Sequence, residues 1–599
     1  MDIDEVKGIP YGISNFEDLR TNNFYYVDKT MFLPTLERAA NFLFLIRPRR
    51  FGKSMFLSMM NAYYDIEKAD RFDSLFDGLW IKEHPTKLKN QFQVLYFDFS
   101  IAGASMAGET MMDSFNEYCS IVINDFAERY ANYYKPEFVQ EVKSIVSAKA
   151  KLSYIDKKAK NLNYPLYLIV DEYDNFTNVI FSQNGSDALK LLTHASGFYR
   201  EYFKVFKAMF SRILMLGVSP ITLNELTSGY NIATNISNEP SFNAMLGFSE
   251  TDVRQMIAYY QQHGLMKNGL EAMITDMKPW YDNYCFAKNC LKDPKMFNCD
   301  MTLYYLRSQL LHNCAPEEMV DINIRTDYTK LKMLANMDKL SDRLSVIQEI
   351  ADKGYIDMSL VTSFPSEEIA DGDNFTSLIY YYGMLTITGT YRGLLRMGIP
   401  NNCVREQYYQ YLLKYFQQRK MVDGLDLRRM FAVFAYDGEW QETLTFLAEK
   451  YKENSSVRDA IEGEHNISGF FKAYFSIMDY YLLCPEVEMN KGYCEFSCKR
   501  EQNRARSNSA ECSRESRQQF LLLPNKQRFD DVEHSYIIEL KYSKKDAPES
   551  EIQAKYDDAV EQLHRYSEDK LARQLAEGTT LHLIVLQFRG SELLRCEQL

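Results

Sequence analysis

The chain has 599 residues, which is enough for several domains of ordinary size. Hydrophobic residues make up 46% of it and charged residues 25%, a globular composition that excludes a chain disordered throughout. The formal net charge of −13 at pH 7 excludes non-specific DNA binding over the whole surface, so any nucleic-acid site must be a local basic groove.

Cysteines and apolar runs bear on the cellular compartment. Cys285, Cys290, Cys299 and Cys314 form no C-x-x-C pairs, and with only 8 histidines in the chain we expect no zinc site. Unpatterned cysteines in a chain of this length are typical of a reducing cytosol. The acidic N-terminus lacks the apolar core of a signal peptide, and no apolar run approaches the ~20 residues of a membrane span. The sequence therefore predicts a cytoplasmic protein without a membrane partner.

A phosphate-binding pattern follows the first predicted helix, which covers Met31–Ala39. The apolar strand Phe42–Ile46 comes next and ends in the octapeptide RPRRFGKS, Arg47–Ser54, which opens a helix over Met55–Met60. A strand that turns through Gly-Lys-Ser into a helix presents successive backbone N–H groups and the helix N-terminus to an anion. We name Arg47–Ser54 the phosphate loop.

The residues of the phosphate loop have separate expected roles in binding ATP and Mg²⁺. Lys53 is expected to reach the β- and γ-phosphates, and the Ser54 hydroxyl to hold Mg²⁺. Arg47 stands where the general G-x-x-x-x-G-K-[ST] motif has its first glycine. The residues expected to cradle the nucleotide are Arg49, Arg50, Phe51, Gly52, Lys53 and Ser54.

Two further apolar strands end in polar residues. Tyr167–Val170 leads into Asp171 and Glu172, the arrangement of a Walker B strand. Asp171 is expected to hold the Mg²⁺ shell, and Glu172 to orient and deprotonate the attacking water. Ile213–Val218 leads into Ser219, which could sense the γ-phosphate or be a plain loop serine.

Apolar strands that alternate with helices predict an α/β sheet with ligands at the carboxyl ends of its strands. An arginine that acts on the γ-phosphate is also expected, and Arg200 and Arg212 are two candidates for it. Residues 246–420 are predicted to be mostly amphipathic helix, and residues 404–455 again look helical. Residues 497–519 carry many Arg and Ser and almost no apolar side chains, so we expect an inserted, disordered surface segment or a basic arm that touches phosphates.

A second chemical pattern lies near the C-terminus, in the predicted strand His534–Tyr542. Glu539 and Lys541 are two residues apart and therefore project from one face of it. Metal-dependent phosphodiester cleavage needs such a pair: Glu539 would ligate Mg²⁺, while Lys541 would position the nucleophilic water and offset developing charge. E-x-K alone is weak, because most such pairs are exposed strand faces.

A nuclease site of this kind also needs an acidic residue on the preceding antiparallel strand. If the inserted segment is set aside, Gly492–Phe496 runs on into Phe520–Pro524 as one strand, and Glu495 lands opposite Glu539. The two carboxylates would then share one Mg²⁺. A helix over Ala554–Tyr566 is expected to present Gln562 toward the same edge, before a last strand over Leu581–Phe588.

Taken together, these motifs resemble a known bacterial family, common in Bacteroidales, that joins an AAA-ATPase-like domain to a C-terminal PD-(D/E)XK nuclease domain. RPRRFGKS is this family's own version of the phosphate loop. The stretches that carry the resemblance span nearly the whole chain: Ile9–Phe16, Tyr26–Thr30, Arg47–Ser54, Val170–Asp174, Leu246–Ser249, Asp479–Tyr481, Asn490–Cys494 and Ile538–Tyr542.

The resemblance implies a fold and a division into domains. An AAA/STAND-like ATPase would cover residues 1–240, a helical lid and middle region 241–455, and a restriction-endonuclease-like α/β domain 456–599. This chain departs from the family at Glu495, where the family usually has Asp, and at the insert after Phe496. The extra methylene of Glu495 would move a metal ligand by roughly an ångström.

Three functions remain open at this stage. The first is an ATP-regulated, Mg²⁺-dependent DNA endonuclease. The second is an ATP-driven switch whose nuclease-like domain only binds nucleic acid or a partner, which Glu495 and the insert favour. The third is an inert scaffold, against which Asp171 and Glu172 argue.

Overall fold

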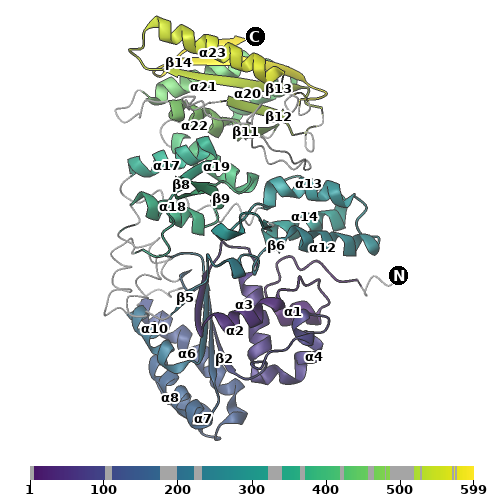
Figure 1. Cartoon of the computed structure of the whole chain (residues 1–599), viewed down its shortest axis with the longest axis vertical. Coiled ribbons are helices and arrows are strands. Elements are labelled where there is room, and N and C mark those ends of the chain that lie inside the picture. The colour runs from purple at the N-terminus through teal and green to yellow at the C-terminus, as the bar shows by residue number, and fades with distance from the viewer. Residues whose placement is uncertain are drawn as a thin grey trace. The chain divides into compact units, whose positions relative to one another are not determined.

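Figure 1 shows the computed structural model of the chain. The chain divides into two compact units, one made of Met1–Met333, Met337–Lys339 and Asp357–Cys403, the other of Leu334–Asn336, Leu340–Ile356 and Val404–Leu599. The residues that the structure describes are 6–100, 111–175, 198–220, 233–293, 295–321, 340–364, 368, 371–417, 424–455, 464–478, 480–485, 519–525, 529, 531–568, 573 and 576–599.

A five-stranded parallel sheet forms the centre of the first unit, in the order β2-β3-β4-β1-β5. Most of its residues are buried, as expected for a parallel sheet that helices cover on both faces. The sheet order confirms the predicted α/β class. The strands are β1 (Phe42–Ile46), β2 (Gln93–Asp98), β3 (Leu166–Asp171), β4 (Arg212–Gly217) and β5 (Thr234–Asn235).

Helices lie on both sides of this sheet, with α1 to α4 on one side and α6, α7, α8 and α10 on the other (Figure 1). Helix α3 packs its apolar side, including Phe56 and Met60, into the main core. The helices are α1 (Phe16–Thr21), α2 (Leu33–Ala39), α3 (Lys53–Tyr64), α4 (Phe72–Leu75), α5 (Trp80–Glu83), α6 (Met111–Arg129), α7 (Phe138–Ser144), α8 (Ala148–Asn161) and α10 (Phe198–Met209).

Three helices with a core of their own follow in the first unit: α12 (Glu250–Gln262), α13 (Leu270–Tyr281) and α14 (Cys299–His312). We call them the lid group. Ser249 caps α12 through a capping box with Asp252, which fixes where this helix begins. A short antiparallel pair, β6 (Phe248–Ser249) and β7 (Met296–Phe297), brings together the segments that lead into α12 and α14.

The region predicted as mostly helix also contains a three-stranded sheet, β8-β10-β9. Its strands are β8 (Tyr355–Met358), β9 (Thr386–Tyr391) and β10 (Leu394–Gly398), and α18 (Gly372–Tyr381) precedes β9. The segment TITGTY of β9 is rich in β-branched residues, which is a strand signal within a region whose other patterns are helical.

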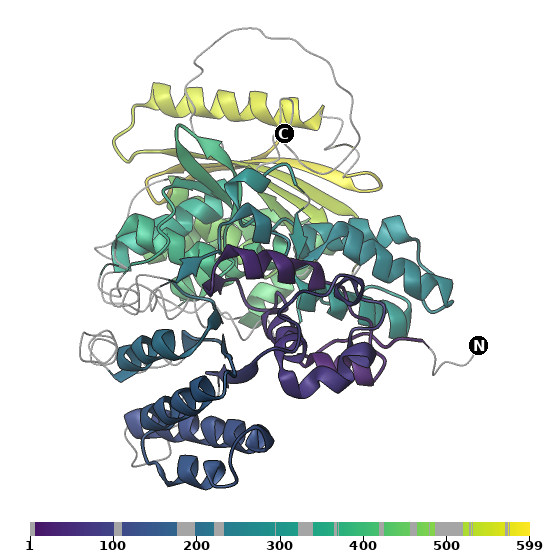
Figure 2. The same ribbon diagram turned by 60° about the horizontal axis from the view of Figure 1, so that its bottom comes forward.

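The second unit begins with helices and ends with a mixed sheet in the order β11-β12-β13-β14-β15. Only β13 and β14 pair in parallel, and α23 (Glu549–Ser567), which connects them, lies along one face of the sheet (Figure 2). The helices before the sheet are α17 (Leu340–Lys353), α19 (Asn402–Gln417), α20 (Gly424–Tyr436), α21 (Trp440–Ser455) and α22 (Glu464–Phe475).

Besides strands that follow the predicted α/β pattern, this mixed sheet contains two that the sequence did not suggest, β11 and β15. Its strands are β11 (Tyr481–Pro485), β12 (Gln519–Pro524), β13 (His534–Ser543), β14 (Thr580–Arg589) and β15 (Glu592–Gln598). The predicted strand Gly492–Phe496 lies outside the described residues, as does the insert up to residue 518. Gln519, which we had assigned to that insert, is the first residue of β12. None of the helices that the structure describes is long and apolar enough to cross a bilayer.

Candidate functional site

The phosphate loop joins β1 to α3 at the carboxyl end of the parallel sheet. Gly52 caps α3 with φ +81°, and Arg50 has φ +67°, so two residues of the loop adopt the left-handed region. Gly52 does this without the steric cost that a side chain brings. The resulting turn leads directly into the N-terminus of α3, where an anion is favoured.

Lys53 is buried at the first position of α3. Its ammonium donates hydrogen bonds to two carbonyls of the loop, those of Pro48 at 2.9 Å and Arg47 at 3.3 Å. Burial lowers the pKa of Lys53, an effect that the carboxylates of Glu172 and Asp171 oppose. The ammonium thus lies inside the turn, among groups that phosphate oxygens could replace.

The phosphate loop and the tip of β3 meet through two side chains. The Ser54 hydroxyl donates a hydrogen bond of 2.5 Å to Asp171 Oδ2. Burial raises the pKa of Asp171 to about 6, the bond from Ser54 and the charge of Lys53 oppose that rise, and the carboxylates of Glu172 and Asp98 add to it. A hydroxyl and a carboxylate that face each other are oxygen ligands that suit Mg²⁺ together with nucleotide phosphates. The residues present therefore fit a magnesium–nucleotide complex.

Glu172 follows Asp171 in a backbone conformation that side chains rarely adopt, with φ +50°. Its N–H donates to Asp171 Oδ1 at 3.0 Å, and its side chain is half-buried. Strained backbone of this kind persists only where surrounding contacts hold it, and it occurs often at functional sites. The bond from the Glu172 N–H holds the Asp171 carboxylate at the turn that follows β3.

Ser219 is fully buried just beyond the end of β4, but its hydroxyl is hydrogen-bonded to Tyr382. Its backbone N–H donates to Asp174 Oδ2 at 2.6 Å, which ties the end of β4 to the segment after β3. Gly217 leaves room for this contact, because a Cβ there would lie 2.5 Å from Asp174 Oδ1 and 2.4 Å from the ring of Tyr173. The role of Ser219 as a γ-phosphate sensor stays a prediction.

Arg47, which stands in place of the motif's first glycine, is one of the largest fully buried side chains of the described residues. Its guanidinium donates to the carbonyls of Ser237 at 2.6 Å and Phe242 at 3.0 Å, and lies 4.2 Å from the centre of the Phe286 ring. Burial lowers the pKa of Arg47 to about 10, so it remains charged at neutral pH. Arg47 anchors the start of the loop to the protein core.

The other predicted cradle residues point in different directions. The Arg50 guanidinium pairs with Asp300 Oδ2 at 2.5 Å, while Phe51 packs edge-on against the rings of Tyr284 and Phe286. The positive charge of Arg49 contributes to the lowered pKa of Lys53, which places it near that ammonium. All three residues contribute backbone to the phosphate loop, and the side chains of Arg50 and Phe51 contact residues outside it.

Two further observations concern residues around this site. Asp98, at the tip of β2, is the register partner of Asp171. It was not among the predicted site residues, although it directly follows the apolar run Val94–Phe97. Arg212 begins β4 and donates to the Glu37 carbonyl at 3.1 Å. It lies at the end of β4 opposite the phosphate loop, so its candidacy for the γ-phosphate within one chain was wrong. Arg200 lies in α10.

The second site lies between β13 and α23. Glu539 is fully buried, and the Lys541 ammonium is 3.2 Å from Glu539 Oε1 and 3.2 Å from Gln562 Oε1. Asp558, four residues before Gln562 on α23, accepts a bond of 2.7 Å from Lys541 and one of 2.8 Å from the Gln562 amide. The structure thus brings together three of the predicted residues and adds Asp558, which its i, i+4 spacing to Gln562 could have suggested.

The predicted position of Glu495 is occupied by another residue. Where β12 pairs with β13, Gln519 stands opposite Glu539. Where β13 pairs with β14, Val585 stands opposite Glu539. The prediction that Glu495 would be the strand partner of Glu539 was therefore wrong: the residue that resumes the strand after the insert, and not the one before it, fills that place. Glu495 itself lies outside the described residues.

The fit of a divalent metal at this second site is incomplete. In the described parts of the chain, no group of three or more His, Cys, Asp or Glu side chains could hold a metal ion. Glu539 supplies one buried carboxylate, and the carboxylate of Asp558 lies at the Lys541 ammonium. The described residues thus contain the E-x-K half of a metal-dependent centre without its strand-borne second acid.

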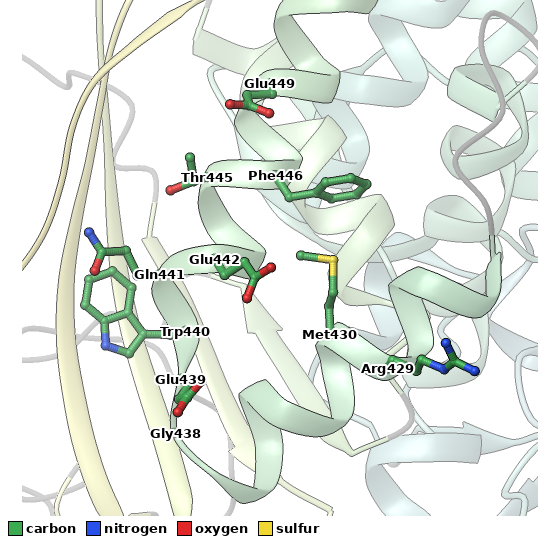
Figure 3. A pocket seen from close by; sticks show the side chains of 10 residues that line it. All are labelled: Arg429, Met430, Gly438, Glu439, Trp440, Gln441, Glu442, Thr445, Phe446 and Glu449. Atoms are coloured by element: carbon green, nitrogen blue, oxygen red, sulfur yellow. The ribbon is translucent and has the colours of Figure 1, made fainter.

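A hollow of about 1040 Å³ lies between α20 and the start of α21 (Figure 3). Its lining includes Glu439, Glu442 and Glu449 beside Trp440, whose indole N–H donates to Gln598 Oε1 at 2.8 Å. None of the residues that line this hollow belongs to either of the two sites described above.

The parallel sheet, the Gly-Lys-Ser loop and the strand-tip carboxylates define an α/β domain of the P-loop class, and the mixed sheet with Glu539 and Lys541 defines a nuclease-like α/β domain. Comparison with known families agrees. Residues 10–227 match the AAA-ATPase_like family, described as a predicted AAA-ATPase, and residues 514–598 match the PD-(D/E)XK nuclease superfamily. The chain therefore carries an AAA-ATPase-like domain at its N-terminus and a PD-(D/E)XK nuclease-superfamily domain at its C-terminus.

Individual relatives add little about function. A curated protein of Azotobacter chroococcum mcd 1, named as an uncharacterized protein in the vnfD 5' region, is 26% identical over 306 residues, which are 48% of this chain and 50% of that protein. The chain thus spans half the length of this relative. The ORC1 protein of Aeropyrum pernix, solved in complex with DNA, aligns over 63% of this chain and 89% of its own with 9% identity and a TM-score of 0.23.

Proposed function

We propose that this protein binds ATP at the phosphate loop with Mg²⁺ and hydrolyses it. The hydrogen bond between Ser54 and Asp171 carries this proposal, because it joins the loop to the tip of β3 through two oxygen ligands. Ser54 and Asp171 would hold Mg²⁺, which would supply positive charge to offset that of the phosphates. Lys53 would leave the Pro48 and Arg47 carbonyls for phosphate oxygens, and Glu172 would orient a water and accept its proton.

A binding titration tests the ATP proposal. A fluorescent ATP analogue is titrated into the full chain with Mg²⁺, and binding should be lost in Lys53→Ala and kept in Lys82→Ala, a control at an exposed ion pair with Asp77. Glu172→Gln should bind the nucleotide and fail to release phosphate. Equal binding by wild type and Lys53→Ala would refute the proposal.

For the C-terminal domain, we propose Mg²⁺-dependent cleavage of DNA phosphodiester bonds under the control of the ATP site. Glu539 would ligate the metal, Lys541 would place the attacking water and stabilise developing charge, and Gln562 would support Lys541 from α23. This role requires a second carboxylate, and neither strand partner of Glu539 supplies it. Glu495, which lies outside the described residues, would have to approach Glu539 from another position than the one opposite it.

The alternative is an ATP-driven switch whose nuclease-like domain binds nucleic acid or a partner without cleaving it. The register favours it, because Gln519 is the strand partner of Glu539 where the sequence predicted an acid. An amide is a weaker ligand for a divalent cation than a carboxylate.

Plasmid nicking distinguishes these two functions. Nicking that requires Mg²⁺ or Mn²⁺, changes with ATP and disappears in Lys541→Ala and Glu495→Ala would support the endonuclease. Retention of ATP binding without nicking under either metal, with DNA binding intact, would support the switch. Circular dichroism of each variant checks that it is folded.

A further inference from the structure

The phosphate loop has an anionic neighbour that no motif indicates. Asp300 Oδ2 is 2.5 Å from the Arg50 guanidinium, and the Asp300 N–H reaches the Arg50 carbonyl at 3.5 Å. Both residues belong to the first compact unit. The preceding residue, Cys299, has its Sγ 3.7 Å from where a Cβ on Gly52 would stand. The first turn of α14, in the lid group, therefore lies directly against the part of the loop that enters α3.

This contact concentrates charge beside the predicted phosphate site. The side chains of Arg50 and Asp300 are 29% and 26% exposed, so water and salt screen their pairing less than that of a fully exposed pair. The Asp300 carboxylate also lies at the positive N-terminal end of α14. One carboxylate thus offsets both a guanidinium of the phosphate loop and a helix terminus.

A bound triphosphate would meet this carboxylate as a like charge. The backbone N–H groups of the loop and the N-terminus of α3 favour an anion at the site that Lys53 faces. Arg50 is three residues from Lys53 in the same turn, and its φ of +67° is held by its surroundings rather than by intrinsic preference. Phosphate oxygens and Asp300 therefore compete for one guanidinium, and each weakens the hold of the other.

We propose that Asp300 is an anionic competitor of the nucleotide phosphates for Arg50, so that ATP binding releases the first turn of α14 from the phosphate loop. The inference rests on the proposed binding of ATP at this loop. Departure of the nucleotide restores the pair between Arg50 and Asp300. The lid group then reports whether the site is filled, and Asp300 sets the affinity of the site.

A double-mutant cycle on ATP affinity tests this competition. The dissociation constant of a fluorescent ATP analogue with Mg²⁺ is measured at low salt for wild type, Asp300→Asn, Arg50→Met and the double variant. Asp300→Asn should bind about 3- to 10-fold more tightly, in the range of ordinary coupling between sites. Arg50→Met should bind more weakly, and on that background Asp300→Asn should bring a clearly smaller gain than it brings in wild type.

Glu250→Gln is the matched control, because it also removes one carboxylate from the lid group. Glu250 pairs with Arg254 and Lys278 inside that group and not with the phosphate loop. Its ATP affinity should stay within about twofold of wild type. A gain equal to that of Asp300→Asn would assign the effect to net charge alone and overturn the competition.

Amide hydrogen exchange of residues 299–303 provides a readout besides affinity. These amides should exchange faster when ATP is added to wild type. In Asp300→Asn they should already exchange fast without ATP. Suppose that Lys53→Ala loses ATP binding but Asp300→Asn binds ATP no more tightly than wild type. This result would overturn the role of Asp300 as a competitor and leave the proposed function standing. Absence of ATP binding by wild type would overturn both.

Discussion

Gly383 lies against Pro48 of the phosphate loop so closely that a Cβ on Gly383 would stand 2.7 Å from the Cβ of Pro48. Gly383 follows α18 and has φ +80°, a conformation that glycine adopts at no steric cost. Beside it, Tyr382 is hydrogen-bonded to Ser219 near the end of β4. Two adjacent residues after α18 therefore touch both the loop and the neighbouring strand end.

Replacing Gly383 by Ala should weaken both the fold and nucleotide binding. The new methyl group meets the rigid ring of Pro48 and forces a left-handed backbone on a side chain, so we expect a loss of about 2–4 kcal/mol in unfolding free energy and a weaker ATP affinity. Gly393→Ala is the control, because Gly393 has φ +91° and nothing within 4 Å of a Cβ. It should cost about 1–2 kcal/mol and leave ATP affinity unchanged. Equal effects of the two variants on ATP affinity would refute a role of the Pro48 contact.

The affinity for Mg²⁺ and ATP should fall as the pH drops below about 6. Burial raises the pKa of Asp171 to about 6, so the carboxyl is protonated below that pH and no longer an ionised ligand. Titrations of wild type between pH 5 and 8 should show this loss, and Asp171→Asn should bind weakly at every pH. A wild-type affinity that does not change between pH 5 and 8 would contradict this prediction.

The same shift has a consequence for stability in the absence of nucleotide. An acid whose pKa is higher in the folded than in the unfolded chain stabilises the fold at low pH, and this contribution is lost as the pH rises from about 4 to 6. Asp171→Asn should show a smaller decrease over that range in thermal unfolding. Burial also raises the pKa of Asp282 to about 6, so part of the dependence should remain in the variant.

Arg47→Gly restores the first glycine of the general motif and should nevertheless damage the protein. The variant loses hydrogen bonds from the guanidinium to the carbonyls of Ser237 and Phe242 and leaves a void beside Phe286. We expect about 3–5 kcal/mol lower stability by urea unfolding, since buried carbonyls lose a charged donor. Arg47→Lys keeps the charge but not the planar guanidinium, so its stability should lie between those of wild type and Arg47→Gly. Wild-type stability of Arg47→Gly would show that the anchor is dispensable.

Lys541→Met should destabilise the second unit whether or not the domain cleaves DNA. The variant removes the ammonium beside Glu539, whose side chain is fully buried, and loss of this charged partner should cost about 3–5 kcal/mol. Adding Glu539→Gln to Lys541→Met should recover much of that loss in denaturant unfolding. If the double variant is no more stable than Lys541→Met, the ion pair is not the cause.

The sequence predicted the local parts of both sites well. The predicted strand Phe42–Ile46 has the same bounds as β1, and α3 begins at Lys53, inside the predicted phosphate loop. Asp171 at the end of β3 and the strand that carries Glu539 and Lys541 were also identified. These features depend on contiguous residues, because the strand period, the turn glycine and the polar residue after an apolar run are all written within about ten positions.

Partners brought together by tertiary contacts were not predictable in this way. The pairing of Arg50 with Asp300 spans 250 positions, and nothing local distinguishes an arginine that anchors a loop, like Arg47, from one that binds phosphate. The register that sets Gln519 opposite Glu539 depends on where the chain resumes its strand after the insert.

The sequence by itself determined that this chain has a phosphate loop before a helix, a carboxylate at a strand end and an E-x-K strand, because short-range periodicity and turn chemistry encode each of them. Only the tertiary structure decided which groups these side chains meet. Burial, sheet register and long-range packing choose the partner of a charged side chain, and a pattern along the chain carries no record of that choice.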